Sequence, residues 1–148
     1  MYRVPIGGKW SVGARSTPGN VKVDTSPMVW NLSTVNRGGG IEHAFTFGTG
    51  APVVGDWDGD GVQTAATFNK GVWTFTNQIV DAGGTPAVVR TITFGADGDT
   101  PLAGDWDGDG IETIGYYRNG SWTLTDEPIS TMGPDGPKTV TTFRWGLD

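Results

Sequence analysis

Short runs in which apolar and polar side chains alternate cover most of the chain. Residues 72–76 (VWTFT) alternate with a period of two, which fits a half-buried strand. The run 64–68 precedes it, and Asn69-Lys70-Gly71 between them supplies a hairpin turn; Asn119-Gly120 stands at the matching turn further on, and both residues tolerate positive φ. No window of helical length carries a 3.6-residue apolar stripe free of Gly and Pro. The pattern predicts short antiparallel strands.

The strands belong to a repeat. Residues 52–76 and 101–125 are identical at thirteen of twenty-five positions with an offset of 49, including the block GDWDGDG. The N-terminal segment is a degenerate copy, in which Lys9-Trp10 stands where the later copies have Asp-Trp. The chain therefore divides into three units of 45–50 residues, which cover about 4–48, 52–95 and 101–146.

Each unit has room for four strands. In the second unit we expect them at 64–68, 72–76, 88–94 and 101–104. Four strands in 45–50 residues are typical of β-propeller blades. The predicted fold is all-β: a β-propeller of four-stranded antiparallel blades, with three blade-equivalents in the chain.

Two loops place aspartates at positions 1, 3 and 5 of the pattern D-x-D-x-D-G. Three carboxylates this close repel one another unless a cation lies among them, and the glycines at positions 4 and 6 let the loop curl. Hard oxygen ligands in a flexible loop favour Ca²⁺. Position 7 offers a backbone carbonyl and position 9 a threonine, which completes the predicted ligand set: Asp56, Asp58, Asp60, Val62 and Thr64 in one loop, and Asp105, Asp107, Asp109, Ile111 and Thr113 in the other.

Neither loop is an EF-hand, because position 12 holds Thr67 or Tyr116 instead of Glu. The alternative to a metal site is an Asx-turn held by local hydrogen bonds without any ion. Two bound Ca²⁺ ions would bring the net charge from −6 to about −2.

Composition and charge exclude or disfavour several other classes. The 148 residues include 16 acidic and 10 basic side chains, a balance that disfavours nucleic-acid binding. The absence of cysteine excludes disulfide frameworks, thiolate zinc sites and cysteine nucleophiles, and the single histidine, His43, disfavours a Ser-His-Asp triad. No apolar run is long enough for a membrane span. We expect no enzymatic activity.

The run Phe47-Gly48-Thr49-Gly50-Ala51-Pro52, followed by DWDGDG at 56–61, resembles the FG-GAP repeat. This is the blade unit of integrin α-subunit propellers and of many bacterial secreted proteins, where related units are called VCBS repeats. The resemblance covers nearly all of the chain, is strong in units two and three, and is weak in unit one. It implies blades around an axis and two structural Ca²⁺ sites per chain, with none in unit one.

Aromatic residues recur in register. Six of the seven tryptophans fall at two repeat positions, and the seventh, Trp145, replaces Phe47 and Phe94. We interpret them as packing between blades, with sugar stacking as the alternative. His43 and Arg144 are interpreted as surface or rim residues, and Asp97 and Asp99 as solvated acids of a Gly-rich loop instead of a hydrolase carboxylate pair.

Three blades are fewer than the four to eight of closed propellers. Residues 4–8 resemble a fourth strand and residues 139–146 a third strand, so the last unit lacks a strand that the N-terminus has to spare. We therefore expect a homodimer that forms a six-bladed ring by strand exchange. A nine-bladed trimer and a fragment of a longer propeller are the alternatives.

The sequence thus predicts a calcium-binding β-propeller module for binding or scaffolding, extracellular or on the cell surface, with a signal peptide not present in this chain. Its ligand would be a glycan or a protein. A purely structural self-assembly unit is the second hypothesis, and a hydrolase domain is a remote third.

Overall fold

The computed structural model describes residues 3–10, 15–33, 41–81 and 83–145. Over these ranges the chain is all-β, with three four-stranded antiparallel sheets. The first sheet contains β1 (Arg3–Gly8), β2 (Thr17–Lys22), β3 (Val29–Leu32) and β4 (His43–Thr46). The second contains β5 (Ala51–Gly55), β6 (Thr64–Asn69), β7 (Val72–Phe75) and β8 (Arg90–Thr93). The third contains β9 (Thr100–Gly104), β10 (Thr113–Arg118), β11 (Ser121–Leu124) and β12 (Thr141–Arg144).

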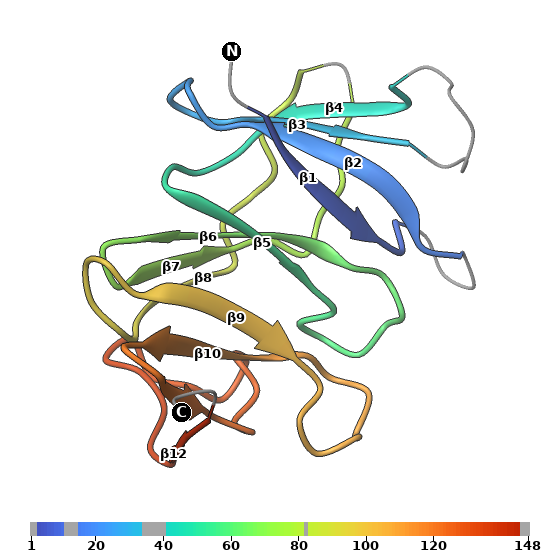
Figure 1. Ribbon diagram of the computed structural model, residues 1–148. Helices are drawn as coiled ribbons and strands as arrows, with labels where there is room; N and C mark the ends of the chain where they lie inside the picture. Colours follow the sequence, from blue (N-terminus) through green and yellow to red (C-terminus); the bar gives the residue numbers. More distant parts are fainter. Residues whose placement is uncertain (1–2, 11–14, 34–40, 82, 146–148) are drawn as a thin grey trace.

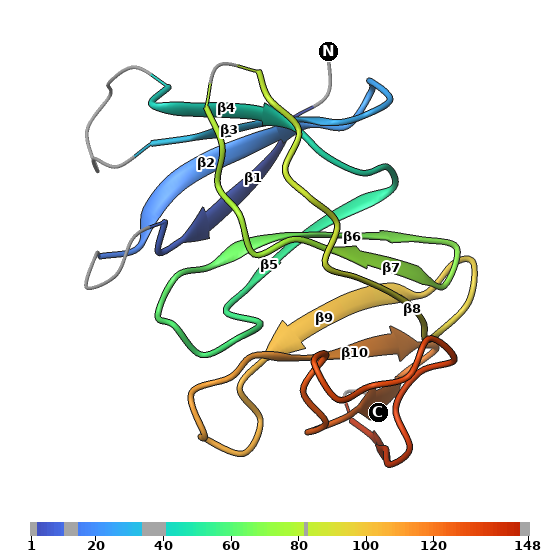
Figure 2. The ribbon, with the colours of Figure 1, turned by 180° about the vertical axis from the view of Figure 1, so that it is seen from behind.

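The three sheets follow one another in space as they do along the chain (Figure 1). Their first strands are neighbours, because β1 contacts β5 and β5 contacts β9. Seen from behind, the first and third sheets again lie on opposite sides of the second (Figure 2). The arrangement is repeat-like, and each end of the row has one sheet face that no other described sheet covers.

The strand pairing corrects the predicted place of one strand. Residues 101–104 belong to β9, which pairs with β10 and begins the third sheet, whereas the repeat pattern predicts them to be the fourth strand of the second unit. The first strand of the second sheet is β5, paired with β6. The acidic loops are therefore the connections between the first two strands of a sheet, and neighbours in sequence become neighbours in the sheet.

This correction removes the basis for strand exchange. The N-terminal strand β1 pairs with β2 inside its own sheet, and the third sheet has its four strands from this chain. No sheet lacks a strand among the described residues, so the strand that we expected to be spare is already in use.

The hairpin turns are as predicted. Asn119 and Gly120 have φ of 48° and 81°, and Lys70 and Gly71 have φ of 52° and 89°. Two successive residues with positive φ give the turn the twist of the strands that it joins, which explains the choice of Gly and Asn there.

A glycine two residues before a tryptophan recurs at the start of each acidic or equivalent loop. A Cβ atom on Gly8, Gly55 or Gly104 would lie 2.5–2.6 Å from the ring of the tryptophan that follows two residues later. The tryptophan therefore folds back over the end of the first strand, and only glycine leaves room for it. This contact explains the G-x-W part of the repeat.

The core consists of two layers between consecutive sheets. Trp30 of the first sheet and Trp73 of the second are fully buried, and their indole N–H groups donate to the backbone oxygens of Phe47 at 3.0 Å and Phe94 at 2.9 Å. Trp10 and Trp57 are buried as well. In the first two sheets the tryptophans thus pack between sheets, as we interpreted.

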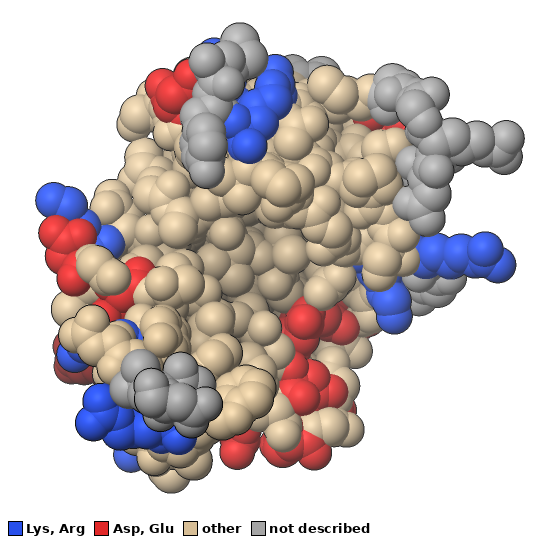
Figure 3. All heavy atoms as spheres, viewed as in Figure 1, with Lys and Arg blue, Asp and Glu red and all other residues tan. Residues whose placement is uncertain are grey.

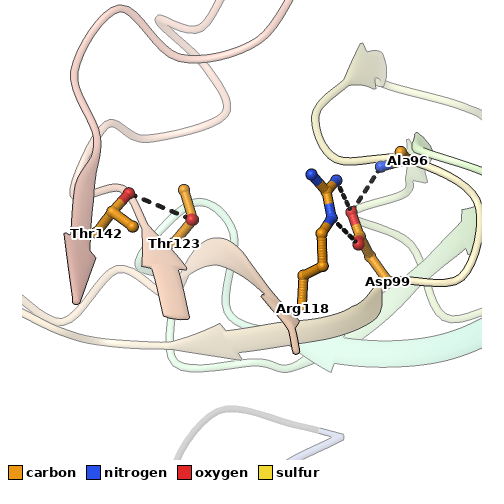
Figure 4. Close-up of polar contacts among 5 residues, drawn as sticks. All are labelled: Ala96, Asp99, Arg118, Thr123 and Thr142. Carbon is orange, nitrogen blue, oxygen red and sulfur yellow. Dashed lines mark hydrogen bonds and ion pairs between the residues drawn. The ribbon is translucent and has the colours of Figure 1, made fainter. Parts of the chain in front are cut away.

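One acid of the Gly-rich loop before β9 is not solvated. The Asp99 side chain is 1% exposed and receives two hydrogen bonds from Arg118 of β10, both 2.6 Å long (Figure 4). It also accepts from the backbone N–H of Ala96 at 2.7 Å, so it fixes the loop to the sheet. Asp97 is exposed, as expected. Figure 4 also shows Thr123 and Thr142, whose hydroxyls are 3.3 Å apart across β11 and β12.

We predict that Asp99→Asn destabilises the fold by about 2 kcal/mol at pH 7. The substitution removes the negative charge that pairs with Arg118, and asparagine offers one acceptor oxygen at this buried place where aspartate offers two. Hydrogen bonds from Arg118 lower the pKa of Asp99 below its usual value. A lowered pKa adds stability that is complete above the unfolded-state value of about 3.9 and is lost as the pH falls through the folded-state value. Urea unfolding of both proteins should show their difference shrinking at the acid end. A difference that stays constant to about pH 2 would contradict this.

Candidate metal centres

The loop between β5 and β6 is organised around Asp56. One carboxylate oxygen of Asp56 accepts from the backbone N–H of Gly59 at 2.8 Å, and the other accepts from Gly61 at 2.8 Å. Gly59 and Gly61 have φ of 78° and 87°, so the curl needs glycine at both places. The loop wraps its backbone around the first aspartate.

The other two aspartates of this loop hold local turns. Asp58 accepts from the N–H of Asp60 at 3.2 Å, and Asp60 accepts from the N–H of Val62 at 2.8 Å. One oxygen from each of Asp56, Asp58 and Asp60 lies within 4.8 Å of the others, so the three carboxylates converge. Asp58 and Asp60 are exposed, and a cation can reach the group from solvent.

The loop between β9 and β10 repeats this geometry. Asp105 accepts from the N–H groups of Gly108 at 2.8 Å and Gly110 at 3.0 Å, and Asp109 accepts from Ile111 at 2.8 Å. Asp107 accepts from the N–H of Asp109 at 3.3 Å, and the three carboxylates again come within 4.8 Å of one another. Two acidic triads, in equivalent places of consecutive sheets, could therefore bind metal ions.

The pKa of Asp58 is raised by its place in the first triad. Partial burial raises the pKa of Asp58 above its usual value, and the charges of Asp60 and Asp56 raise it further, against a backbone hydrogen bond that lowers it. The backbone hydrogen bonds are common to a metal-free turn and to a metal loop. The gathering of three negative charges carries a repulsive cost, which a divalent ion would relieve.

The remaining predicted ligands lie beside the triads. Thr64 and Thr113 are the first residues of β6 and β10, both are buried, and the Thr113 hydroxyl donates to the backbone oxygen of Gly104 at 3.3 Å. Val62 and Ile111 close the loops with their N–H groups. In the degenerate first unit the residues corresponding to most of the loop, 11–14, lie outside the described ranges.

Sequence reasoning missed a pair of side chains that join the loops of neighbouring sheets. Glu112 accepts from the backbone N–H of Asp56 at 2.6 Å, and its own N–H donates to the Asp56 carbonyl at 2.8 Å. Gln63 does the same to Lys9, with distances of 3.0 and 2.6 Å. The two contacts, which we call latches, recur at the same place in the repeat. The sequence does contain a signal for the latches. Gln63 and Glu112 both have a long side chain that ends in an acceptor oxygen, and both stand at position 8 of their loop, 49 residues apart.

The latches bring three loops to one side of the molecule. A cleft of about 320 Å³ lies between them. In Figure 3 acidic atoms gather where the loops after β5 and β9 run, with basic atoms beside them toward the first sheet. The cleft lining is drawn from all three units and includes Lys9, Ser16, Asp56, Gln63, Asp105 and Glu112.

His43 takes part in a different junction. Its Nδ1 lies 2.5 Å from a carboxylate oxygen of Asp81, in the connection between β7 and β8 that runs along β4. This contact joins the first sheet to the connection between β7 and β8 of the second sheet.

Comparisons with known proteins give no match: no protein family, curated protein or solved structure is significantly similar to the chain. Within the described ranges, no helix is long and apolar enough to cross a bilayer. The two acidic loops and the sheets that carry them are therefore the features from which a function is inferred.

We predict that Glu112→Ala destabilises the protein by about 1–3 kcal/mol, because it leaves the partly buried N–H of Asp56 without its acceptor. Glu112→Gln is the matched control, since Gln63 makes the same latch with a neutral amide. Urea denaturation of the three proteins measures the effect. Equal losses for Ala and Gln would show that the charge of Glu112, and not its acceptor oxygen, matters.

Proposed function

We propose that this protein is a calcium-stabilised β-repeat module of the FG-GAP type, used for binding or scaffolding outside the cell or at its surface. The observation that carries the proposal is the pair of converging aspartate triads, in the same place of two consecutive sheets. The D-x-D-x-D-G spacing, the four-stranded units and the F-G motif at Phe47-Gly48 support the FG-GAP resemblance.

Calcium suits these loops better than other ions. Each triad offers carboxylate oxygens only, with no nitrogen or sulfur ligand in the group, which disfavours zinc and copper. The loops are exposed and rich in glycine, and Ca²⁺ accepts the irregular, larger coordination shell that such loops provide, whereas Mg²⁺ demands a tight octahedron. Extracellular calcium is millimolar, within the affinity range of extracellular modules.

Bound calcium would also hold the sheets together. Asp56 supplies a carboxylate to its triad while its backbone N–H and C=O form the latch with Glu112 of the next sheet. An ion that fixes the loop also fixes the end of the latch, so metal binding and packing between the second and third sheets are coupled. The role is structural: the ion pre-organises the surface on which a glycan or protein ligand would bind.

We expect isothermal titration with CaCl₂ to give two sites per chain, and EGTA to lower the melting temperature. Saturation at a hundredfold excess over Kd stabilises by about 2.7 kcal/mol per site. Asp58→Asn and Asp107→Asn should each remove one site, because each takes one negative oxygen from its triad while keeping an acceptor for the loop backbone.

Lys9→Ala is the control, since Lys9 holds the position of Asp56 and Asp105 in the unit whose sequence lacks the aspartate triad, and this variant should keep both sites. The same melting temperature with calcium and with EGTA would mean that the loops are metal-free turns.

A glycan array tests the recognition role separately. Sugar binding that needs calcium would support the lectin-like form of the proposal, in which pre-organised loops contact the ligand. An array without signal would favour a scaffold that recognises protein.

A further inference from the structure

The third sheet has an aromatic face that no other part of the described chain covers. On the side away from the second sheet it presents Tyr117, Trp122 and Phe143, which are cross-strand neighbours in β10, β11 and β12. Trp145 extends this face and is 73% exposed. The residues that line its hollow, about 360 Å³ in volume, are Thr100, Leu102, Tyr117, Trp122 and Trp145. We call this surface the open face.

The same repeat positions are buried in the other two sheets. Trp122 corresponds to Trp30 and Trp73, which are both 0% exposed. Phe143, at 42% exposure, pairs with Trp122 as the fully buried Ile92 pairs with Trp73. The open face therefore has aromatic residues at the repeat positions that form a buried layer in the other two sheets.

The indole N–H groups show a similar difference. Trp30 and Trp73 donate to the backbone oxygens of Phe47 and Phe94. The equivalent residue of the third sheet is Trp145, but the buried Nε1 of Trp122 has no hydrogen-bond partner within the part of the chain that the structure describes. The buried Nε1 atoms of Trp10 and Trp57 also lack a partner there, so the difference concerns only the repeat position that Trp30, Trp73 and Trp122 share.

In the first and second sheets, the face that corresponds to the open face is covered by the following sheet. The covering side chains are small or medium in size and come from its first two strands: Val54 and Ala65 cover the first sheet, and Ala103 and Ile114 cover the second. The connection before the last strand of the covering sheet adds apolar residues, Ile129 among them. The occupant of this kind of face is always the next unit.

The first sheet carries the matching surface. Gly7 and Pro18, both exposed, occupy the positions that Val54 and Ala65 hold in the second sheet, as the pairing of β1 with β2 and of β5 with β6 shows. They lie on the side of the first sheet away from the second. Small residues there leave room for the large aromatic side chains of an open face.

The two ends also have opposite charge. Residues 1–46 contain five basic and two acidic residues, whereas residues 96–148 contain three basic and ten acidic residues. Two like ends would repel each other, and unlike ends attract. Asp105 stands where Lys9 and Asp56 stand, and Ser16 where Gln63 and Glu112 stand, so the two ends carry the backbone positions of a latch, while the serine side chain is too short to accept as Gln63 and Glu112 do.

We propose that the open face of the third sheet docks on the first sheet of a second copy of this chain, and that the reciprocal contact closes a ring of two copies. Six sheets fall within the four to eight of closed propellers, and two head-to-tail contacts related by a two-fold axis leave no face open. Whole sheets meet face to face, so no strand is exchanged. The inference does not depend on calcium occupancy.

Sedimentation velocity of the full chain from 1 to 50 µM tests the proposal, in calcium and again in EGTA so that failure of metal binding is distinguished from failure of docking. We expect a species of twice the 15.6 kDa monomer mass. Its Kd should rise several-fold between 50 and 500 mM NaCl, because salt screens the attraction of the unlike ends. A monomer at 50 µM, or any mass other than two copies, overturns the proposal.

Trp145→Lys should weaken the dimer at least tenfold while leaving the monomer fold intact, because the side chain is exposed in the single chain. Val88→Lys is the matched control, since Val88 is 56% exposed but lies in the connection before β8, away from the open face. An equal effect of the two substitutions would argue against docking through the open face.

Cross-linking determines the orientation, since the chain has no cysteine of its own. Asp56 of the second sheet and Glu112 of the third pair through their backbones. Asp105 of the third sheet and Ser16 of the first hold the same two repeat positions at the free ends. In EGTA, a short bis-maleimide should therefore link Asp105→Cys to Ser16→Cys in a mixture and give no product with either variant alone. Products from one variant alone would show a symmetric contact between like ends and overturn the proposal.

Discussion

The structure depends on aromatic side chains that pack in a layer between each pair of consecutive sheets. Trp30 and Trp73 present large rings on one face of their sheets, and the next sheet meets them with small residues such as Ala65. Burying rings of this size contributes more than any single polar contact, and each indole hydrogen bond fixes the ring against its own sheet. A four-stranded sheet of this length has no core by itself, so every unit needs a neighbour.

Polar contacts then determine how neighbouring sheets are aligned. The latches tie the loop of one sheet to the loop of the next through both the N–H and the C=O of a single residue, Lys9 or Asp56. Asp56 also belongs to an acidic triad. The charge of the loop and the contact between the second and third sheets therefore depend on the same residue. The buried pair of Asp99 and Arg118 fixes the passage from the second sheet to the third in the same manner.

The third sheet shows the same construction without its covering neighbour. Its tryptophans and Phe143 keep the register of the buried layers but remain partly exposed. Exposed apolar faces of this kind mark association sites, and the unlike charges of the two ends fit the head-to-tail docking that we propose. A second copy docked in this way would supply the missing neighbour.

The sequence alone determined the local features: strand periodicity, the number of units, the two hairpin turns and the aspartate triads, because each depends on residues close together in the chain. It did not determine which strand begins each sheet, since a 49-residue period is the same from whichever strand it is counted. Pairing of β9 with β10 decided that point. The roles of Asp99 and Glu112 also needed the tertiary structure, because their partners, Arg118 and Asp56, are brought to them only when sheets and strands pack.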